Sequence, residues 1–374
     1  MTNQQLAAKP RRTIDEVSII RVIACLSVVL LHSIKFSTGD SSEGAIQFGL
    51  WSLAGLLSFG TSTFVFISAL ILAYSYPKQL PNGFYAKRIR FLLIPFACMA
   101  IFYAIVSGLT KDWSIPKLVV YNLLGAYHGW FVLVIFQFYV LHQLYAAYID
   151  RFRPAVVLGV SLFVNVLYLG FFNLVPPPAG GLAAYIWERG YWMPFTGWLF
   201  YFSLAYYCGR HYELFLRGLE RYKWWIIAAL PLTAGWVVYN NAFSSLGFGS
   251  KRVDMIGFTV VMILLLFLLL RGVKRIPPLV TLISQYSFGI YLVHWFFLEM
   301  MDRAIERLGI ALGYAEIPLL FVAGIACCIV TIWVFNHMVP FGQYVVGRIN
   351  TGRSVRTQAS IRTTTTHSTA AENG

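Results

Sequence analysis

Ten predominantly apolar stretches, most of them about 20 residues long, constrain this sequence more than any other feature. A helix needs about 20 such residues to cross roughly 30 Å of hydrocarbon. The pattern therefore predicts an all-α fold, a polytopic membrane helical bundle with about ten spans. In the over-long second span, Gly55 and Gly60 are expected to mark either a kink or an interfacial start. The predicted spans are Val17 to Phe36, Phe48 to Tyr76, Ile89 to Leu109, His128 to Ile149, Pro154 to Val175, Tyr191 to Cys208, Trp224 to Asn241, Val253 to Leu270, Leu279 to Met300 and Ile317 to Met338.

The composition agrees with a membrane environment. Of the 374 residues, 58% are hydrophobic and only 12% are charged, whereas globular proteins carry about 25% charged residues. A soluble chain with so few charges could not cover its apolar surface, but lipid makes that surface favourable. We therefore expect a multi-pass protein integral to the cell (cytoplasmic) membrane, with the first apolar run retained as a signal anchor.

The net charge of +14 indicates topology rather than nucleic-acid binding, because the basic residues lie between the apolar runs. Of the 29 Lys and Arg residues, 20 fall on the side of the N-terminus, 8 fall on the opposite side, and Arg21 lies within the first span. The positive-inside rule then predicts that both termini are cytoplasmic. The expected organisation is a cytoplasmic segment over residues 1–16, a transmembrane domain over 17–340 and a cytoplasmic, disordered tail over 341–374.

Two ionisable residues, Arg21 and His32, lie within the first span. An Arg near a helix centre costs about 2.5 to 3.5 kcal/mol on insertion, so such a group is a functional candidate. Their separation places the two side chains about 20° apart around the helix and some 16 Å apart along it. In the ordinary interpretation Arg21 snorkels to headgroups and His32 caps a helix end. In the functional one, the His32 imidazole exchanges a proton near neutral pH.

His128 and His294 are predicted to lie at the depth of His32, in the outer half of the membrane. The three histidines would share an outward-facing pocket if their helices are neighbours. Taken separately, the adjacent Trp130 and Trp295 favour a place in an interfacial aromatic belt. No CxxC motif or other metal-binding pattern is present, and no metal site is predicted.

A basic run precedes the third span and contains Lys87, Arg88 and Arg90. Such a cluster suits phosphate groups, because Arg offers paired donors and Lys a point charge. Spacing alone favours ordinary positive-inside charge or contact with anionic lipid. Asp254 and Glu299, near outer helix ends, could orient a histidine or a sugar hydroxyl, but solvation at the interface is the expected role.

Several motifs together resemble the integral-membrane acyltransferase-3 family, whose hallmark is an Arg and a His separated by ten residues in the first span. Arg21 and His32 match that hallmark. Ala69 departs from the pattern, since the family usually has glycine after the position of Ser68. Ser18 stands where many members carry an aspartate three residues before the arginine, and this arrangement is similar to the branch with polysaccharide O-acetyl- and O-succinyltransferases. Four further segments match in family order: TFVFISALIL (residues 63–72), FYAKRIRFLLIPF (84–96), HGWFV (128–132) and YSFGIYLVHW (286–295).

The resemblance implies O-acyl transfer from cytoplasmic acyl-CoA, acetyl-CoA or succinyl-CoA, to a hydroxyl of a cell-envelope or extracellular polysaccharide. Catalytic roles are predicted for His32 and Arg21, and binding of the acyl-CoA phosphates for Lys87, Arg88 and Arg90. The expected partners are acyl-CoA, the glycan acceptor and the lipid bilayer, with no nucleic acid; a homo-oligomer or association with polysaccharide synthesis machinery is also compatible. The predicted substrate-binding residues are His128, Trp130, His294 and Ser68.

Two other functions remain open from the sequence. An exporter of a polysaccharide or lipid-linked glycan would share the spans and the polar pocket, but it would use alternating access and consume no acyl-CoA. A sensor or scaffold would tolerate loss of the charge at Arg21.

Overall fold

The structure is a computed structural model that describes residues 14–39, 44–111, 113–149, 151–244, 246–273 and 275–350. Within these ranges it contains helices and turns and no strand. Short 3₁₀ or π-helical segments lie at residues 89–93, 128–130, 145–149, 190–192, 195–198, 313–315 and 342–344. The α-helices are α1 (Asp15–Thr38), α2 (Ala45–Leu57), α3 (Phe59–Ser75), α4 (Phe84–Arg88), α5 (Ile94–Lys111), α6 (Ile115–Leu123), α7 (Phe131–Leu144), α8 (Pro154–Leu174), α9 (Gly181–Glu188), α10 (Leu199–Arg210), α11 (Tyr212–Arg221), α12 (Lys223–Phe243), α13 (Met255–Leu270), α14 (Pro278–Arg307) and α15 (Glu316–Met338).

The predicted fold class, a polytopic helical membrane protein, is confirmed. Among the described residues, seven helical segments are long and apolar enough to cross a bilayer. The other three predicted spans also contain helices, namely α10, α13 and α14. Of these, α10 has 12 residues and α13 has 16. The count of ten spans and the cytoplasmic placement of both termini stay predictions.

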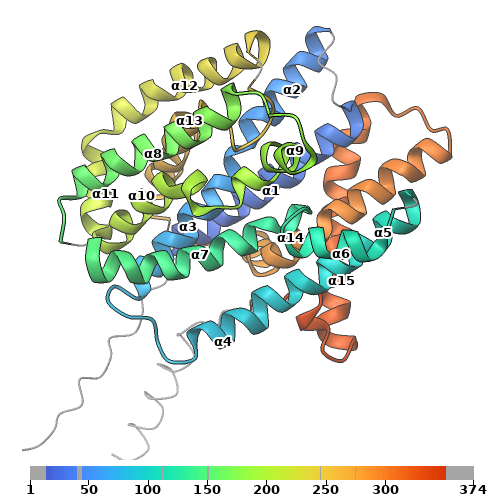
Figure 1. The fold of residues 1–374 in the computed structure, drawn as a ribbon, viewed down its shortest axis with the longest axis horizontal. Helices are drawn as coiled ribbons and strands as arrows, with labels where there is room; N and C mark the ends of the chain where they lie inside the picture. Colours follow the sequence, from blue (N-terminus) through green and yellow to red (C-terminus); the bar gives the residue numbers. More distant parts are fainter. Residues whose placement is uncertain are drawn as a thin grey trace, which may run out of the picture.

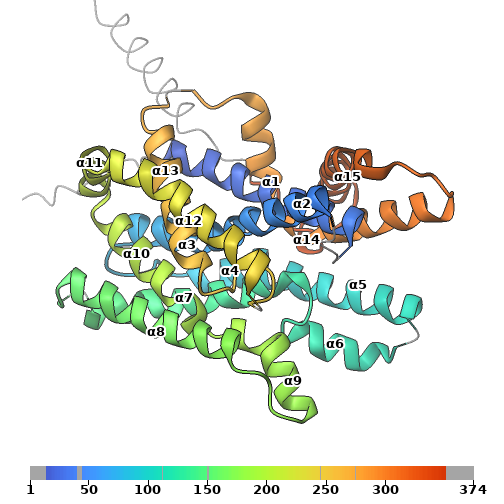
Figure 2. The ribbon, with the colours of Figure 1, turned by 90° about the horizontal axis from the view of Figure 1, so that it is seen from above.

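Helix α1 lies between two groups of helices that bury separate apolar cores. One core joins the first part of α1 to α3, α7, α10 and α13, and the other joins α1 to α5, α14 and α15. Figures 1 and 2 both show α10 to α13 on one side of α1, and α5, α6, α14 and α15 on the other. Side chains of α1 are therefore placed in contact with both halves of the bundle.

The over-long second run is interrupted, as the sequence predicts, but at Ser58, between the two glycines. Helix α3 then packs against α1 so closely that a Cβ at Gly60 would lie 2.7 Å from the Ala24 carbonyl oxygen. Small residues permit such close approach of membrane helices. Helices α1 and α3 are therefore in close contact at the level of Ala24.

The basic run and the histidines lie at opposite ends of the bundle. The end of α3 meets the end of α7 where His142 Nε2 donates to the Tyr76 carbonyl oxygen at 2.8 Å. The Tyr76 ring also lies 5.6 Å from that of Phe84 at the start of α4. His32, near the end of α1, and His128, just before α7, belong to the opposite end. The basic run and the histidines are thus separated by the length of α7.

The folded part of the chain extends past the expected domain boundary at residue 340. Val346 and Ile349 are buried in the second core, and the Asn350 amide donates to the Gln285 carbonyl oxygen at 3.1 Å. The expected tail from Thr351 onward and the first 13 residues lie outside the described residues.

Helices α3 and α10 are packed closely at Gly209, which generates a stability prediction. A Cβ at this position would lie 2.4 Å from the Leu70 carbonyl oxygen. Gly209→Ala should push the helices apart and destabilise the protein by about 1 to 3 kcal/mol, as overpacking does. Gly159→Ala in α8 is the control, because nothing lies within 4 Å of its Cβ. Thermal unfolding in detergent measures both variants. Equal melting temperatures would contradict the packing described.

Candidate functional site

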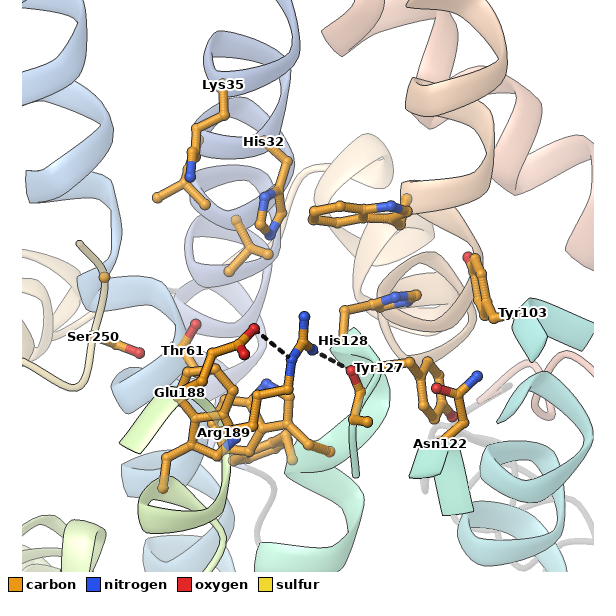
Figure 3. Close-up of a pocket in the computed structure, with 18 of the residues that line it drawn as sticks. His32, Lys35, Thr61, Tyr103, Asn122, Tyr127, His128, Glu188, Arg189 and Ser250 are labelled. Atoms are coloured by element: carbon orange, nitrogen blue, oxygen red, sulfur yellow. Dashed lines mark hydrogen bonds and ion pairs between the residues drawn. The ribbon is translucent and has the colours of Figure 1, made fainter. Parts of the chain in front are cut away.

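A cavity of about 830 Å³ opens at the end of the bundle that holds the histidines. This volume lies within the range of small-molecule sites, about 300 to 1,000 Å³. Its walls come from the last turns of α1, the turn before α7, the end of α9, the loop between α12 and α13, and the middle of α14. Figure 3 shows His32 and Lys35 of α1, with His128 and Arg189 from two other segments, around this space.

Three histidines line the cavity together, as the sequence predicts for neighbouring helices. The His294 ring is the central one: its centroid lies 5.4 Å from that of His32 and 5.3 Å from that of His128. Trp295 contacts both outer rings, with centroids 4.9 Å from His32 and 5.9 Å from His128. Three predicted site residues from α1, the α7 turn and α14 therefore form one cluster.

Backbone carbonyl groups fix the tautomers of two of these rings. His294 Nδ1 lies 2.9 Å from the carbonyl oxygens of both Ile290 and Tyr291. A carbonyl oxygen only accepts, so Nδ1 carries the proton and Nε2 of the neutral ring carries the lone pair. His128 Nε2 lies 3.0 Å from the Leu292 carbonyl oxygen, which by the same argument leaves the lone pair on Nδ1.

Two ring nitrogens of the cluster have no partner within the part of the chain that the structure describes. They are His294 Nε2 and His32 Nδ1, both buried. A buried polar atom without a partner costs free energy unless another molecule satisfies it. These two nitrogens therefore offer a place for a proton or for a hydroxyl of a bound molecule.

Tyrosines hold the His128 turn against α14. Tyr291 Oη donates to the His128 carbonyl oxygen at 2.6 Å and accepts from the Phe131 amide at 3.3 Å. The Tyr103 ring meets the His128 ring edge-on with centroids 4.7 Å apart. Tyr103 Oη also donates to the Leu292 carbonyl oxygen at 3.1 Å. The ring orientation of His128 thus depends on two helices besides its own segment.

Trp130, a predicted substrate-binding residue, lies in an aromatic wall of the cavity. Its ring stacks on Trp192 at 5.8 Å and on Trp198 at 5.4 Å between centroids. Stacked indoles present large rigid apolar faces. The wall is suited to a flat, partly apolar surface such as a sugar ring.

Arg189 extends into the cavity from the end of α9. Figure 3 shows its guanidinium between Glu188 and His128, with dashed lines marking its contacts. It is 3.3 Å from the Glu188 carboxylate and donates to the Ala126 carbonyl oxygen, two residues before His128. The Arg189 and Glu188 side chains are 40% and 72% exposed, so water screens the ion pair.

Two lysines of the cavity lie over aromatic rings. Lys35, one turn after His32, has its Nζ 4.7 Å from the Phe248 ring centroid. Lys251, in the loop between α12 and α13, has its Nζ 2.8 Å from the Trp192 centroid. Burial lowers the pKa of Lys251 well below its usual range, and the positive charges of Arg189 and Lys35 lower it further.

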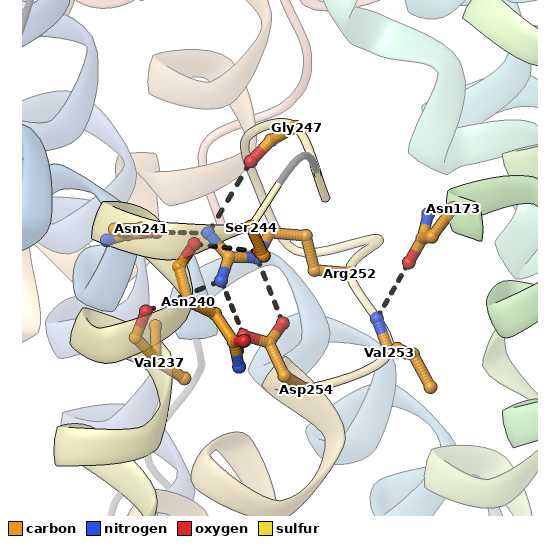
Figure 4. A network of polar contacts seen from close by, with 9 residues as sticks. All are labelled: Asn173, Val237, Asn240, Asn241, Ser244, Gly247, Arg252, Val253 and Asp254. Carbon is orange, nitrogen blue, oxygen red and sulfur yellow. Dashed lines mark hydrogen bonds and ion pairs between the residues drawn. The ribbon is translucent and has the colours of Figure 1, made fainter. Parts of the chain in front are cut away.

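A buried ion pair anchors the loop that carries Lys251. Arg252 Nε donates to Asp254 Oδ1 at 2.9 Å and Nη2 to Oδ2 at 2.5 Å, and both side chains are only 3% exposed. Asn240 and Asn241 of α12 bond to the two partners, as Figure 4 shows. The expectation that Asp254 is solvated at the interface is therefore wrong. The arginine next to it in the fold requires a buried counter-charge.

Arg21 and Ser68 do not line the histidine cavity. Both side chains are partly buried, Arg21 on α1 and Ser68 on α3. The helix rise places Arg21 about 16 Å from His32 along α1. The structure thus puts the two predicted catalytic residues on one helix at different levels, and their roles stay predictions.

The basic run lies at the opposite end of the bundle from the cavity. Arg88 is partly buried, with its guanidinium carbon 5.0 Å from the Phe84 centroid and 5.8 Å from the Tyr139 centroid. Lys87 and Arg90 are exposed. Two of the three basic side chains are therefore accessible to a ligand at that surface.

Several charged and aromatic residues of the cavity were not predicted from the sequence. The sequence does contain one signal for them: some basic residues fall on the side of the membrane opposite the N-terminus, where the positive-inside rule predicts few. Glu299, expected to be solvated, lines the cavity and bonds to Arg303 at 2.5 Å. In the described ranges, no group of three His, Cys, Asp or Glu residues is arranged to hold a metal ion. The missed residues are Lys35, Tyr103, Glu188, Arg189, Trp192, Lys251 and Tyr291.

Comparison with known families decides the assignment. Residues 14–336 match the acyltransferase domain profile of the acyltransferase-3 family. The chain belongs to this family. It is thus a multi-pass membrane acyltransferase, and the resemblance seen in the sequence motifs is confirmed.

Several relatives match over most of their length. A Bacillus subtilis (strain 168) protein provisionally named a membrane-bound acyltransferase is 36% identical, covering 93% of this chain and 98% of its own. A Staphylococcus aureus (strain MRSA252) protein, named a probable poly-beta-1,6-N-acetyl-D-glucosamine export protein, is 25% identical over 76% of this chain and 83% of its own. A Staphylococcus epidermidis protein of the same name is 27% identical over 76% of this chain and 81% of its own. No solved structure gives a significant match.

The buried ion pair generates the second stability prediction. Asp254→Asn leaves the Arg252 guanidinium buried without its counter-charge, which should destabilise the protein by about 3 to 5 kcal/mol. The control is Glu220→Gln, because the Glu220 side chain is 47% exposed beside Lys223 and should matter little. Melting temperatures in detergent measure both effects. If the two variants melt together, Arg252 and Asp254 do not anchor this loop.

Proposed function

We propose that this acyltransferase moves an acetyl or succinyl group from cytoplasmic acyl-CoA to a hydroxyl of a cell-envelope or extracellular polysaccharide. The observation that carries the proposal is the cluster of His32, His128 and His294 around one cavity. Membership of the acyltransferase-3 family supports the transfer chemistry. The aromatic wall beside the histidines supports a sugar as the acceptor.

In the proposed reaction, the acceptor oxygen attacks the carbonyl carbon of the acyl group. A C–O bond forms, the bond from that carbon to its leaving atom breaks, and a ring nitrogen takes the hydroxyl proton. In a direct transfer the leaving atom is the CoA sulfur, which departs as thiolate and receives a proton. In the two-step alternative, His32 first takes the acyl group from sulfur and then releases it to the acceptor.

His32 is the proposed base or acyl carrier, because its Nδ1 has no partner among the described residues. His294 offers Nε2 beside it, with Nδ1 fixed by the carbonyl groups of α14. A neutral ring with its lone pair directed into a cavity is the form that accepts a proton. His128 and Trp130 are proposed to position the acceptor.

The donor is proposed to bind at the opposite end of the bundle. Lys87 and Arg90 are exposed there and would contact the CoA phosphates, with Arg88 beside them. Arg21 of α1 and Ser68 of α3 are proposed to contact the thioester arm. Helix α1 thus links the donor end to the histidine cavity.

An exporter is the second candidate function. The names of the Staphylococcus relatives favour it, since they describe export of poly-beta-1,6-N-acetyl-D-glucosamine. Purified protein incubated with labelled acyl-CoA separates the two, because an exporter leaves the thioester intact. Mass spectrometry of surface glycans from cells with and without the protein then identifies the acyl group and the acceptor.

Removing the His32 imidazole should abolish most of the transfer. General-base assistance contributes about 10² to 10⁴ in rate, so His32→Ala should lower the turnover of labelled acyl-CoA by at least about 10². His337→Ala is the matched control, because His337 is exposed at the end of α15. Acyl transfer is measured in membranes at equal expression. Full activity of His32→Ala would falsify the assignment of the cavity as the reaction site.

Neutralising the exposed basic residues should weaken donor binding. One hydrogen bond to a charged group contributes about 1.5 kcal/mol, or about tenfold in affinity. The double variant Lys87→Gln and Arg90→Gln should raise the KM for acyl-CoA at least about tenfold, with a smaller change in kcat. Arg151→Gln with Arg153→Gln is the control, because both are exposed basic residues before α8. An equal rise in both double variants would indicate general surface charge instead.

A further inference from the structure

The histidine mechanism does not use the positive charges of the cavity. Lys35, Arg189 and Lys251 all line it, from α1, the end of α9 and the loop between α12 and α13. They come from parts of the chain far apart in sequence, so the fold rather than a local motif brings them together. Because they lie beside the proposed reaction centre, their charges affect which molecules the cavity can bind.

Lys251 is the cation whose charge is least compensated. Its side chain is partly buried, with Nζ above the face of Trp192. No carboxylate lies within ion-pair distance of it in the described ranges of the chain. The ring face attracts an ammonium group, but it carries no net charge and accepts no proton. Burial and the neighbouring cations disfavour the charged form of Lys251, and a bound anion would restore it, so this place favours a negatively charged ligand.

The carboxylates of the cavity are already engaged elsewhere. Glu188 pairs with Arg189 at the exposed rim, and Glu299 pairs with Arg303 of its own helix at 2.5 Å. Neither of these two carboxylates, which line the described part of the cavity, is therefore available to Lys251. The positive charge near Trp192 remains open to a molecule from outside.

The loop that carries Lys251 is held at both of its ends. On one side, Phe248 packs on Trp51 with centroids 4.5 Å apart and lies under the Lys35 ammonium. On the other, Arg252 is fixed by its buried pair with Asp254. Between these anchors, Lys251 has a defined place in the cavity wall, which a binding residue needs.

We propose that Lys251, with Arg189 and Lys35 nearby, binds a carboxylate group of the molecule that occupies the histidine cavity. The inference rests on the proposed function, since it concerns a substrate of that same site. The anionic group has two chemical sources. It belongs either to an acidic acceptor glycan or to a dicarboxylic acyl group such as succinyl.

The test measures binding without turnover, using full-length protein in nanodiscs and two pairs of probes. The acceptor pair is tetragalacturonate and uncharged maltotetraose, and the donor pair is succinyl-CoA and acetyl-CoA. Wild-type protein should bind the more negative member of at least one pair about tenfold more tightly. Lys251→Gln should remove that preference and leave the affinity for the other member unchanged, whereas Lys251→Arg should retain it.

Lys117→Gln is the matched control, because Lys117 is an exposed lysine 5.6 Å from the Tyr121 ring centroid that does not line the cavity. It should keep the wild-type preference. Loss of the preference for tetragalacturonate assigns the anion to the acceptor, and loss of that for succinyl-CoA assigns it to the acyl group.

The proposal is overturned if wild-type protein prefers neither acidic probe, or if Lys251→Gln binds like wild type or no more weakly than Lys117→Gln. These outcomes leave the proposed function intact when His32→Ala still loses acyl transfer. Conversely, His32→Ala could keep full acyl transfer while the preference for an acidic probe still depends on Lys251. That result would contradict the proposed function and support an anion site at Lys251.

Discussion

The absence of water from the hydrocarbon core is the constraint on which this structure depends. Every polar group placed there must find its partner within the protein. The backbone meets this demand as helices, and the side chains meet it by gathering between them, as Asn240 and Arg252 do around Asp254. In the histidine cavity, His32 Nδ1 and His294 Nε2 are buried without a partner among the described residues. What distinguishes the cavity from the packed interior is that these two nitrogens belong to neighbouring rings at the wall of a space of about 830 Å³.

Helix α1 gives the two halves of the bundle a common element. Its first part packs in the core with α3 and α10, and its later part in the core with α14 and α15. His32 therefore reaches His294 across an interface that is otherwise apolar. Arg21, on the same helix, lies three residues before Ala24, which α3 approaches at Gly60. One helix thus sets the relative levels of an arginine and a histidine without any direct contact between them.

The fold class and the histidine cluster could be predicted from the sequence because both follow from local patterns. Apolar runs define the helices, and threading direction fixes the depths of His32, His128 and His294. The cations of the cavity could not be predicted in the same way. Arg189 and Lys251 lie outside the regular helices, and their position depends on long-range contacts with Ala126 and Trp192. Asp254 was misjudged for the same reason, since its partner is set by a loop conformation.

The anchored loop between α12 and α13 separates the proposed choice of substrate from the proposed chemistry, two properties that are often built from the same residues. The histidines belong to helices or helix starts in the bundle, so changing them disturbs the shared interior. Residues 248–251 contribute to the cavity from outside the helices, and their neighbours Trp51 and Asp254 hold them in place. Related chains could therefore diverge in what they accept through exchanges in four loop positions, while the helical framework and its chemistry stay unchanged.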